Sequence, residues 1–197
     1  MAAILDGKRV LIIAMDGVEQ VELDEPRKAL QEAGARVDLV APSGKNIQGM
    51  DHIDKADLLP VDRTIDEVSV DEYDALVIPG GVVNSDHLRA EEGAVRFVRD
   101  FYRSGKPMGV ICHGAWILVE TGLLSGAVLT SYPTLQTDIR NTGATWVDQE
   151  AVLYKGLVTS RRPRDLPAFN DNLIRVIAEG RRHDRLPKEQ QGYKAAA

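Results

Sequence analysis

The sequence predicts an α/β domain with a doubly wound, mostly parallel sheet, and three observations support this class. Short apolar runs without polar alternation recur along the chain, as expected of strands buried on both faces. Segments with a helical pattern separate these runs. One run, residues 107–111, stops at Cys112 before a helical pattern begins at Ala115, which predicts a nucleophile elbow.

The first half of the chain contains two strands, a helix and a polar connection. The expected elements are strands at 9–14 and 36–40 and a helix at 20–33 that ends before Gly34. Residues 42–60 are polar and contain glycine, which predicts a surface loop or a small hairpin.

The second half continues the alternation. A strand at 75–78 ends at Pro79-Gly80-Gly81, and a helix at 94–104 leads to the strand before Cys112. Five further elements are expected: a strand at 128–130, a helix at 134–142, a pair of β-strands at 151–154 and 157–160, and a helix at 164–178. Repeated strand, helix, strand units imply right-handed crossovers.

Length and composition predict one domain in a reducing compartment. A chain of 197 residues with 44% hydrophobic content can bury one core, expected at about 8–178, while 181–197 form a tail that is loosely held or docks a neighbouring subunit. One cysteine excludes an intramolecular disulfide, and the start of the chain lacks the apolar stretch of a secretory signal. We therefore expect a cytoplasmic protein.

Charge and hydropathy bear on possible partners. The formal net charge of -6 argues against nucleic acid as a major partner. No run approaches the roughly 20 apolar residues of a membrane helix, so no membrane association is expected.

Cys112 is the first candidate site residue. A thiol at the end of a core strand, above the free N–H groups of a helix N-terminus, is expected to ionise easily and to have a pKa below the ordinary value of about 8.5. The alternative is that a lone cysteine at the end of a strand is simply a small buried apolar residue. The adjacent His113, the glycine and the change from strand to helix favour a reactive thiol.

Two other segments are expected beside Cys112, because the carboxyl ends of parallel strands share one edge of the sheet. The first carries Glu19 and Glu22, three residues apart, which could instead be ordinary acids of a first helical turn. The second carries Gly80 and Gly81, whose N–H groups could stabilise an oxyanion or simply form a tight turn.

Asp86 and His87 follow the glycine pair in the sequence Asn84-Ser85-Asp86-His87. Without further information, they read as the ordinary polar residues of a loop.

Four sequence blocks, taken together, resemble the PfpI family of intracellular proteases. This family belongs to the glutamine-amidotransferase-like superfamily, which also contains the parkinsonism-associated deglycase and its bacterial stress-induced relatives. The resemblance extends from about residue 8 to residue 177, and its four blocks lie in the family's order at 110–116, 129–133, 138–148 and 159–169.

The resemblance implies a flavodoxin-like three-layer sandwich and particular roles. Cys112 matches the family nucleophile, His113 the histidine beside it, and Glu22 the glutamate whose carboxyl group touches the thiol. Gly81 and the backbone N–H of His113 resemble the oxyanion hole, and Tyr132 matches a tyrosine near the mouth of the pocket. An ionised Glu22 would raise the pKa of the thiol, so this contact is expected to involve a protonated carboxyl group that donates to sulfur.

The resemblance also implies a homo-oligomer, either a dimer or a hexamer. In PfpI proteases an acidic residue from a neighbouring subunit completes a Cys-His-acid triad, and here the match falls on Asp86. The segment after Gly81 is one residue longer than in the archaeal proteins, and the acid is Asp instead of Glu.

The sequence thus predicts a stress-related cysteine hydrolase that needs no cofactor and no metal. Its substrates would be peptides, small carbonyl compounds or glycated proteins, cleaved by a peptidase, an amidase or a deglycase. The alternative is a redox-sensing or chaperone-like stress protein in which oxidation of Cys112 is the main event.

Overall fold

The computed structural model describes residues 3–180. The tail at 181–197, for which the sequence predicts loose attachment or subunit docking, lies outside the described residues. Within the described part, no helix combines the length and the apolar character that crossing a membrane requires.

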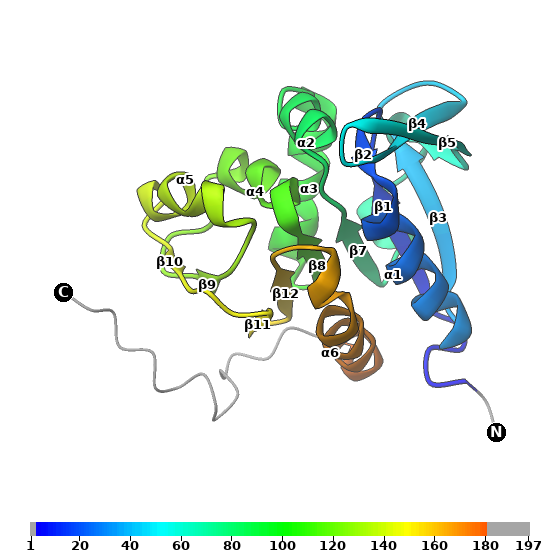
Figure 1. The fold of residues 1–197 in the computed structure, drawn as a ribbon. Coiled ribbons are helices and arrows are strands. Elements are labelled where there is room, and N and C mark those ends of the chain that lie inside the picture. Colours follow the sequence, from blue (N-terminus) through cyan, green and yellow to red (C-terminus); the bar gives the residue numbers. More distant parts are fainter. Residues whose placement is uncertain (1–2, 181–197) are drawn as a thin grey trace.

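A seven-stranded sheet forms the middle layer, in the order β11-β12-β8-β7-β1-β3-β6 (Figure 1). All neighbouring pairs are parallel except β11 with β12, at one edge. The strands are β1 (Arg9–Ile13), β3 (Arg36–Ala41), β6 (Arg63–Thr64), β7 (Ala75–Ile78), β8 (Met108–Ile111), β11 (Ala151–Tyr154) and β12 (Leu157–Ser160). This confirms the predicted flavodoxin-like sheet.

The helices cover both faces of this sheet. They are α1 (Gln20–Glu32), α2 (Val82–Leu88), α3 (Glu92–Ser104), α4 (Ala115–Thr121), α5 (Gln136–Asn141) and α6 (Leu166–Glu179). Leu11 of β1 packs in the cluster that holds Phe101 of α3, whereas its neighbour Ile12 packs in the cluster that holds Leu23 of α1 and Phe169 of α6. Alternate residues of β1 therefore enter two different cores, which explains its uninterrupted apolar sequence.

The remaining short elements of residues 3–180 are five strands outside the main sheet and several single turns of 3₁₀ helix. A hairpin of β4 (Asn46–Asp51) and β5 (Asp54–Pro60) confirms the small hairpin expected at 42–60, and β2 (Val18–Glu19) extends it. A separate pair contains β9 (Val128–Leu129) and β10 (Thr145–Trp146). The 3₁₀ turns are η1 (Ile65–Glu67), η2 (Val70–Glu72), η3 (Cys112–Gly114), η4 (Pro133–Leu135) and η5 (Pro163–Asp165).

Two features differ from the sequence prediction. The polar stretch that contains Asn84 is the helix α2, which the sequence did not predict because seven residues with four polar ones in a row show no clear apolar period. The strand expected at 128–130 pairs with β10 instead of joining the main sheet. Neither difference changes the three layers.

Candidate active site

Cys112 occupies the turn between β8 and α4 in a strained backbone conformation. Its φ is 61°, in the left-handed region that residues other than glycine seldom adopt, at a cost of about 1 to 3 kcal/mol. Two contacts hold this turn. The Cys112 carbonyl accepts a hydrogen bond of 3.1 Å from the backbone N–H of Tyr132. A Cβ at Gly114 would lie 2.7 Å from the carbonyl oxygens of Ile78 and Pro79, so only glycine allows the turn to pack against β7.

Glu22 is fully buried beside this thiol. It lies in the first turn of α1, and its Oε2 accepts a hydrogen bond of 2.9 Å from the backbone N–H of Gly80. Its other oxygen, Oε1, has no hydrogen-bond partner within the described residues. A Cβ at Gly80 would overlap Oε2 and would lie 2.7 Å from Cβ of Cys112. Glycine at this position therefore lets the carboxyl group and the thiol meet.

His113 contacts the sulfur directly and is enclosed by aromatic rings. Its Nδ1 lies 3.3 Å from Sγ of Cys112. The ring stacks on Tyr132, with centroids 4.5 Å apart, and lies 5.4 Å from the ring of Trp116. Tyr132 is thus placed at the site, in contact with the histidine. Trp116 was not singled out in the sequence, although its place one turn after the elbow could have suggested it.

The pKa of the thiol departs from the sequence prediction. Burial raises the pKa of Cys112 well above the ordinary range, and negative charge on Glu22 raises it further. Hydrogen bonds from the backbone N–H groups of His113 and Gly81 lower it, but do not reverse the effect. The sequence prediction of a low pKa for Cys112 is wrong, because it counted the N–H groups and overlooked the removal of solvent.

The two neighbouring groups are held in their neutral forms. Burial raises the pKa of Glu22 from 4.5 to about 8, with a small further rise from Glu19, while hydrogen bonds from Cys112 and Gly80 limit the change. Burial lowers the pKa of His113 from 6.5 to about 4. At neutral pH the protein therefore holds a protonated carboxyl group and an uncharged imidazole around the thiol.

Gly81 brings its N–H group to the sulfur from the start of α2. Its φ of 89° is accessible to glycine, and an added Cβ would lie 2.6 Å from the backbone nitrogen of Glu19. Gly80 and Gly81 thus both face the Cys112 and Glu22 pair, as the sequence predicted from their position.

Asp86 does not meet His113 within one chain. It is exposed on α2, where both Nε and Nη2 of Arg89 donate to its Oδ1 at 3.0 and 2.9 Å. The guanidinium of Arg89 also lies over the ring of Trp116, 4.8 Å from the centroid. His87 is likewise exposed. The role of Asp86 in a neighbouring subunit stays a prediction.

One group of side chains in residues 3–180 could hold a metal ion. Ligand atoms of Glu19, Asp51 and His52 lie within 4.8 Å of one another at the β4–β5 turn. Nδ1 of His52 is already 3.2 Å from a carboxylate oxygen of Glu19, and the Asp51 and His52 side chains are mostly exposed. Glu19 therefore contacts the hairpin instead of the thiol.

The chain matches the DJ-1/PfpI family over residues 8–176. It belongs to that family. Protein/nucleic acid deglycase 2 of Escherichia coli K12 is 38% identical over 173 residues, which cover 86% of this chain and 98% of the relative. A protein named putative cysteine protease YraA, from Bacillus subtilis 168, is 37% identical over 173 residues, again with 86% and 98% coverage.

A solved structure agrees with the family fold. The two-domain protein of Anabaena variabilis with DJ-1/ThiJ/PfpI-like and ferritin-like domains superimposes with a TM-score of 0.81 and 30% identity. The match covers 95% of this chain and 52% of that one, so the chain spans about half the length of that protein.

Proposed function

We propose that this DJ-1/PfpI protein is a cysteine-dependent hydrolase that acts on small carbonyl adducts, as a deglycase does. The observation that carries this proposal is the contact of Cys112 with both Glu22 and His113 on a strained elbow. Cys112 is only 7% exposed, and the ring of His113 stacks on Tyr132 and lies beside the tilted ring of Trp116. Such enclosure favours a small adduct over an extended polypeptide, and so favours a deglycase over a peptidase.

In the proposed mechanism, Cys112 forms a bond to the electrophilic carbon while His113 accepts the thiol proton. The imidazole must be uncharged to act as a base, and the low pKa of His113 meets this requirement at neutral pH. The N–H groups of Gly81 and His113 would stabilise the negative oxygen that develops on the substrate. His113 then gives the proton to the amine nitrogen as its bond to the attacked carbon breaks. The hemithioacetal left on Cys112 rearranges to a thioester by a proton shift between its two carbons, and water hydrolyses this thioester to a hydroxy acid and the free thiol.

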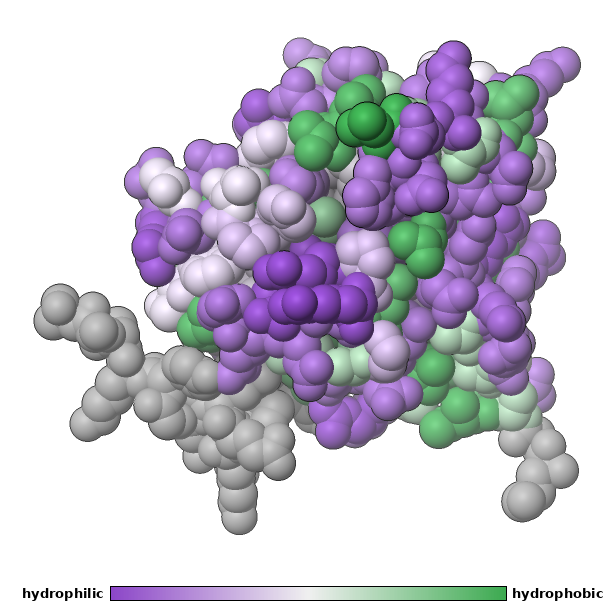
Figure 2. Space-filling model, in the orientation of Figure 1, coloured by the Kyte–Doolittle hydropathy of each residue, from purple (hydrophilic) through white to green (hydrophobic). Residues whose placement is uncertain are grey.

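We further propose that a second copy completes the site with Asp86. Two observations support this. In one chain burial alone sets the pKa of His113, and within residues 3–180 no carboxylate is hydrogen-bonded to its ring. Val82 and Val83, at the start of α2, are apolar and about half exposed, and Figure 2 shows hydrophobic residues near the top of the molecule, where α2 lies. A carboxylate against His113 would raise its pKa and make it a better base.

The central test measures turnover of a methylglyoxal adduct of an acetylated amino acid. A dipeptide amide serves as the second substrate and tests for peptidase activity. Cys112→Ser is expected to lower turnover of the adduct by a factor of about 10³ or more, because a hydroxyl is a poor nucleophile in this setting. Asp86→Ala should lower it as well, and light scattering should show an oligomer. Full activity of Cys112→Ser would contradict the proposal.

Redox sensing is the second candidate, because the unpartnered Oε1 of buried Glu22 could donate to an oxidised sulfur when protonated. Peroxide treatment followed by intact mass separates the two functions. A sensor would stop at a stable two-oxygen form that Glu22→Ala destabilises, and would show no adduct turnover.

A further inference from the structure

Asn84 is a fully buried amide on α2 whose contacts are unusual for a structural residue. Its Nδ2 donates to the carbonyl oxygen of Gly80 at 2.9 Å and to that of Pro79 at 3.3 Å. Its Oδ1 accepts the backbone N–H of Met15 at 2.8 Å. The three contacts also fix the orientation of the amide, since the reverse orientation would place oxygen against two carbonyls and NH₂ against an N–H.

The two carbonyls that accept from Asn84 belong to the two peptide groups whose N–H groups donate to Glu22 and Cys112. The peptide whose C=O comes from Pro79 has the N–H of Gly80, which donates to Oε2 of Glu22 at 2.9 Å. The next peptide has the C=O of Gly80 and the N–H of Gly81, which donates to the Cys112 sulfur. None of the described peptide bonds is cis, so in each peptide the C=O and N–H point in opposite directions.

A hydrogen bond to the oxygen of each peptide therefore fixes where its N–H points. Both peptides contain glycine, which has few conformational restraints of its own, and Gly81 has a φ of 89°. The third contact of Asn84, to Met15, holds the segment after β1 that continues into β2 and α1, the helix that carries Glu22.

We propose that Asn84 is a positioning residue of the active site, which orients the Gly80 and Gly81 N–H groups toward Glu22 and Cys112. It touches neither the sulfur nor the expected substrate atoms and acts through the two peptides. The proposal rests on the proposed function in taking Cys112 as the reacting atom. It predicts that the ionisation of a thiol on another element depends on this amide.

The test measures the alkylation rate of Cys112 with iodoacetamide against pH in Asn84→Ala. Because the chain contains a single cysteine, all labelling reports Cys112. Misdirecting the Gly81 donor should raise the pKa of the thiol by about one, so that about tenfold less thiolate is present at a given pH below it. Two titratable side chains contact the thiol, His113 and Glu22, and Asn84→Ala also weakens the hydrogen bond from Gly80 to Glu22. Repeating the comparison in a Glu22→Gln background therefore isolates the Gly81 contribution.

Ser85→Ala is the matched control. Ser85 is the next residue of α2, is buried, and its hydroxyl has no hydrogen-bond partner within the described residues. Its pH profile should match that of the parent. An Asn84→Ala profile identical to the parent, or an equal shift in both variants, would overturn the proposal.

A measurement on the unmodified protein covers the case in which Asn84→Ala does not fold. Both side-chain amide protons of Asn84 should exchange slowly with solvent, and the Gly81 amide resonance should move when Cys112 is alkylated. Rapid exchange, or a Gly81 resonance that does not move, contradicts the proposal.

Failure of the positioning role can be distinguished from failure of the proposed function. A parent protein without adduct turnover, but with a thiol pKa that depends on Asn84, would contradict the function and leave the positioning role supported.

Discussion

Glu22 beside Cys112 and Asp38 beside Arg9 are both buried acids, yet the net shifts of their pKa values have opposite directions. The pKa of Glu22 rises to about 8, because burial removes water and no cation within the described residues replaces it. Burial also acts to raise the pKa of Asp38, but hydrogen bonds from Arg9 and Tyr73 outweigh it and lower the value.

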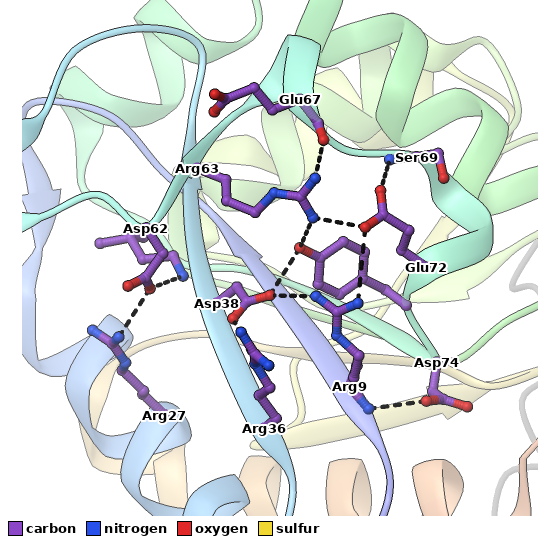
Figure 3. A network of polar contacts seen from close by, with 12 residues as sticks. Arg9, Arg27, Arg36, Asp38, Asp62, Arg63, Glu67, Ser69, Glu72 and Asp74 are labelled. Atoms are coloured by element: carbon purple, nitrogen blue, oxygen red, sulfur yellow. Dashed lines mark hydrogen bonds and ion pairs between the residues drawn. The ribbon is translucent and has the colours of Figure 1, made fainter.

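The surroundings of Asp38 explain its charge. Nη2 of Arg9 and the hydroxyl of Tyr73 both donate to its Oδ2 at 2.9 Å, and Arg36 donates to its Oδ1 at 3.4 Å. Figure 3 shows this acid inside a network that continues to Arg63. A buried acid paired in this way maintains the fold, whereas the unpaired Glu22 can hold a proton at neutral pH and is available for chemistry.

The largest effect is expected where the unpaired acid meets the thiol. In Gly80→Ala the new Cβ would overlap the Glu22 carboxyl group and Cys112, and displacement of these groups should lower turnover by about a hundredfold or more. Gly93→Ala is the control, because its Cβ would lie 3.7 Å from Ile65. Steady-state kinetics of both variants provide the measurement, and wild-type turnover in Gly80→Ala would mean that the pair is not held closely.

Glu22→Gln should change how stability depends on pH. Between the unfolded pKa of 4.5 and the folded value of about 8, the folded chain holds a proton that the unfolded chain has lost, so wild-type stability falls as pH rises. Gln removes this effect, and the variant should gain about 3 to 5 kcal/mol relative to wild type from low pH to pH 8. Urea unfolding at several pH values measures it.

The titration of His113 also changes stability with pH, so the effect of Glu22 must be taken from the difference between wild type and Glu22→Gln. With its pKa lowered to about 4, the unfolded chain binds a proton between there and 6.5 that the folded chain does not, so stability rises with pH in that interval. Both proteins share this contribution. A constant stability difference between them from pH 4 to 9 would show that folding leaves the pKa of Glu22 unchanged, and would contradict a protonated carboxyl group at neutral pH.

Asp38→Ala should show the opposite dependence. Its loss leaves Arg9 and Tyr73 without their acceptor, at a cost of about 2 to 3 kcal/mol near neutral pH, reduced from the value for a fully buried pair because Arg9 is partly exposed. Because the folded pKa of Asp38 is lowered, its contribution is present above 3.8 and is lost as pH falls through the folded value. Urea unfolding at pH 7 measures the loss of stability, and urea unfolding at pH 2.5 measures how far that loss disappears in acid. A stability difference that persists undiminished in acid would contradict the charged role.

The smallest effect is expected at the exposed edge of the paired network. Lys8 and Asp74 form an ion pair of 3.1 Å, with side chains 32% and 38% exposed. Lys8→Gln should change the free energy of unfolding by about 0.5 kcal/mol or less, because solvent screens this pair. Thermal unfolding at low and high salt measures the change, and a loss similar to that of Asp38→Ala would mean that burial does not separate the two pairs.

Much of the fold and part of the site follow from local sequence. The uninterrupted apolar strands and the abrupt change at Cys112 predict the sheet and the elbow, and the family resemblance points to Glu22 and His113 as neighbours of the thiol. The depth of burial around the thiol depends on segments distant in the sequence, so the direction of its pKa shift could not be read from the elbow alone. Asn84 shows the same limit, since its contacts with Met15 and Pro79 exist only after three segments have folded together.

The left-handed backbone of Cys112 has a consequence for how this site can be lost. Glycine adopts that conformation without strain, so Cys112→Gly should be tolerated by the turn even though it removes the only thiol in the chain. Cysteine and glycine codons differ by one nucleotide. A family built on this elbow can therefore give rise in a single step to well-folded members without the nucleophile, whose fold would reveal nothing of the change.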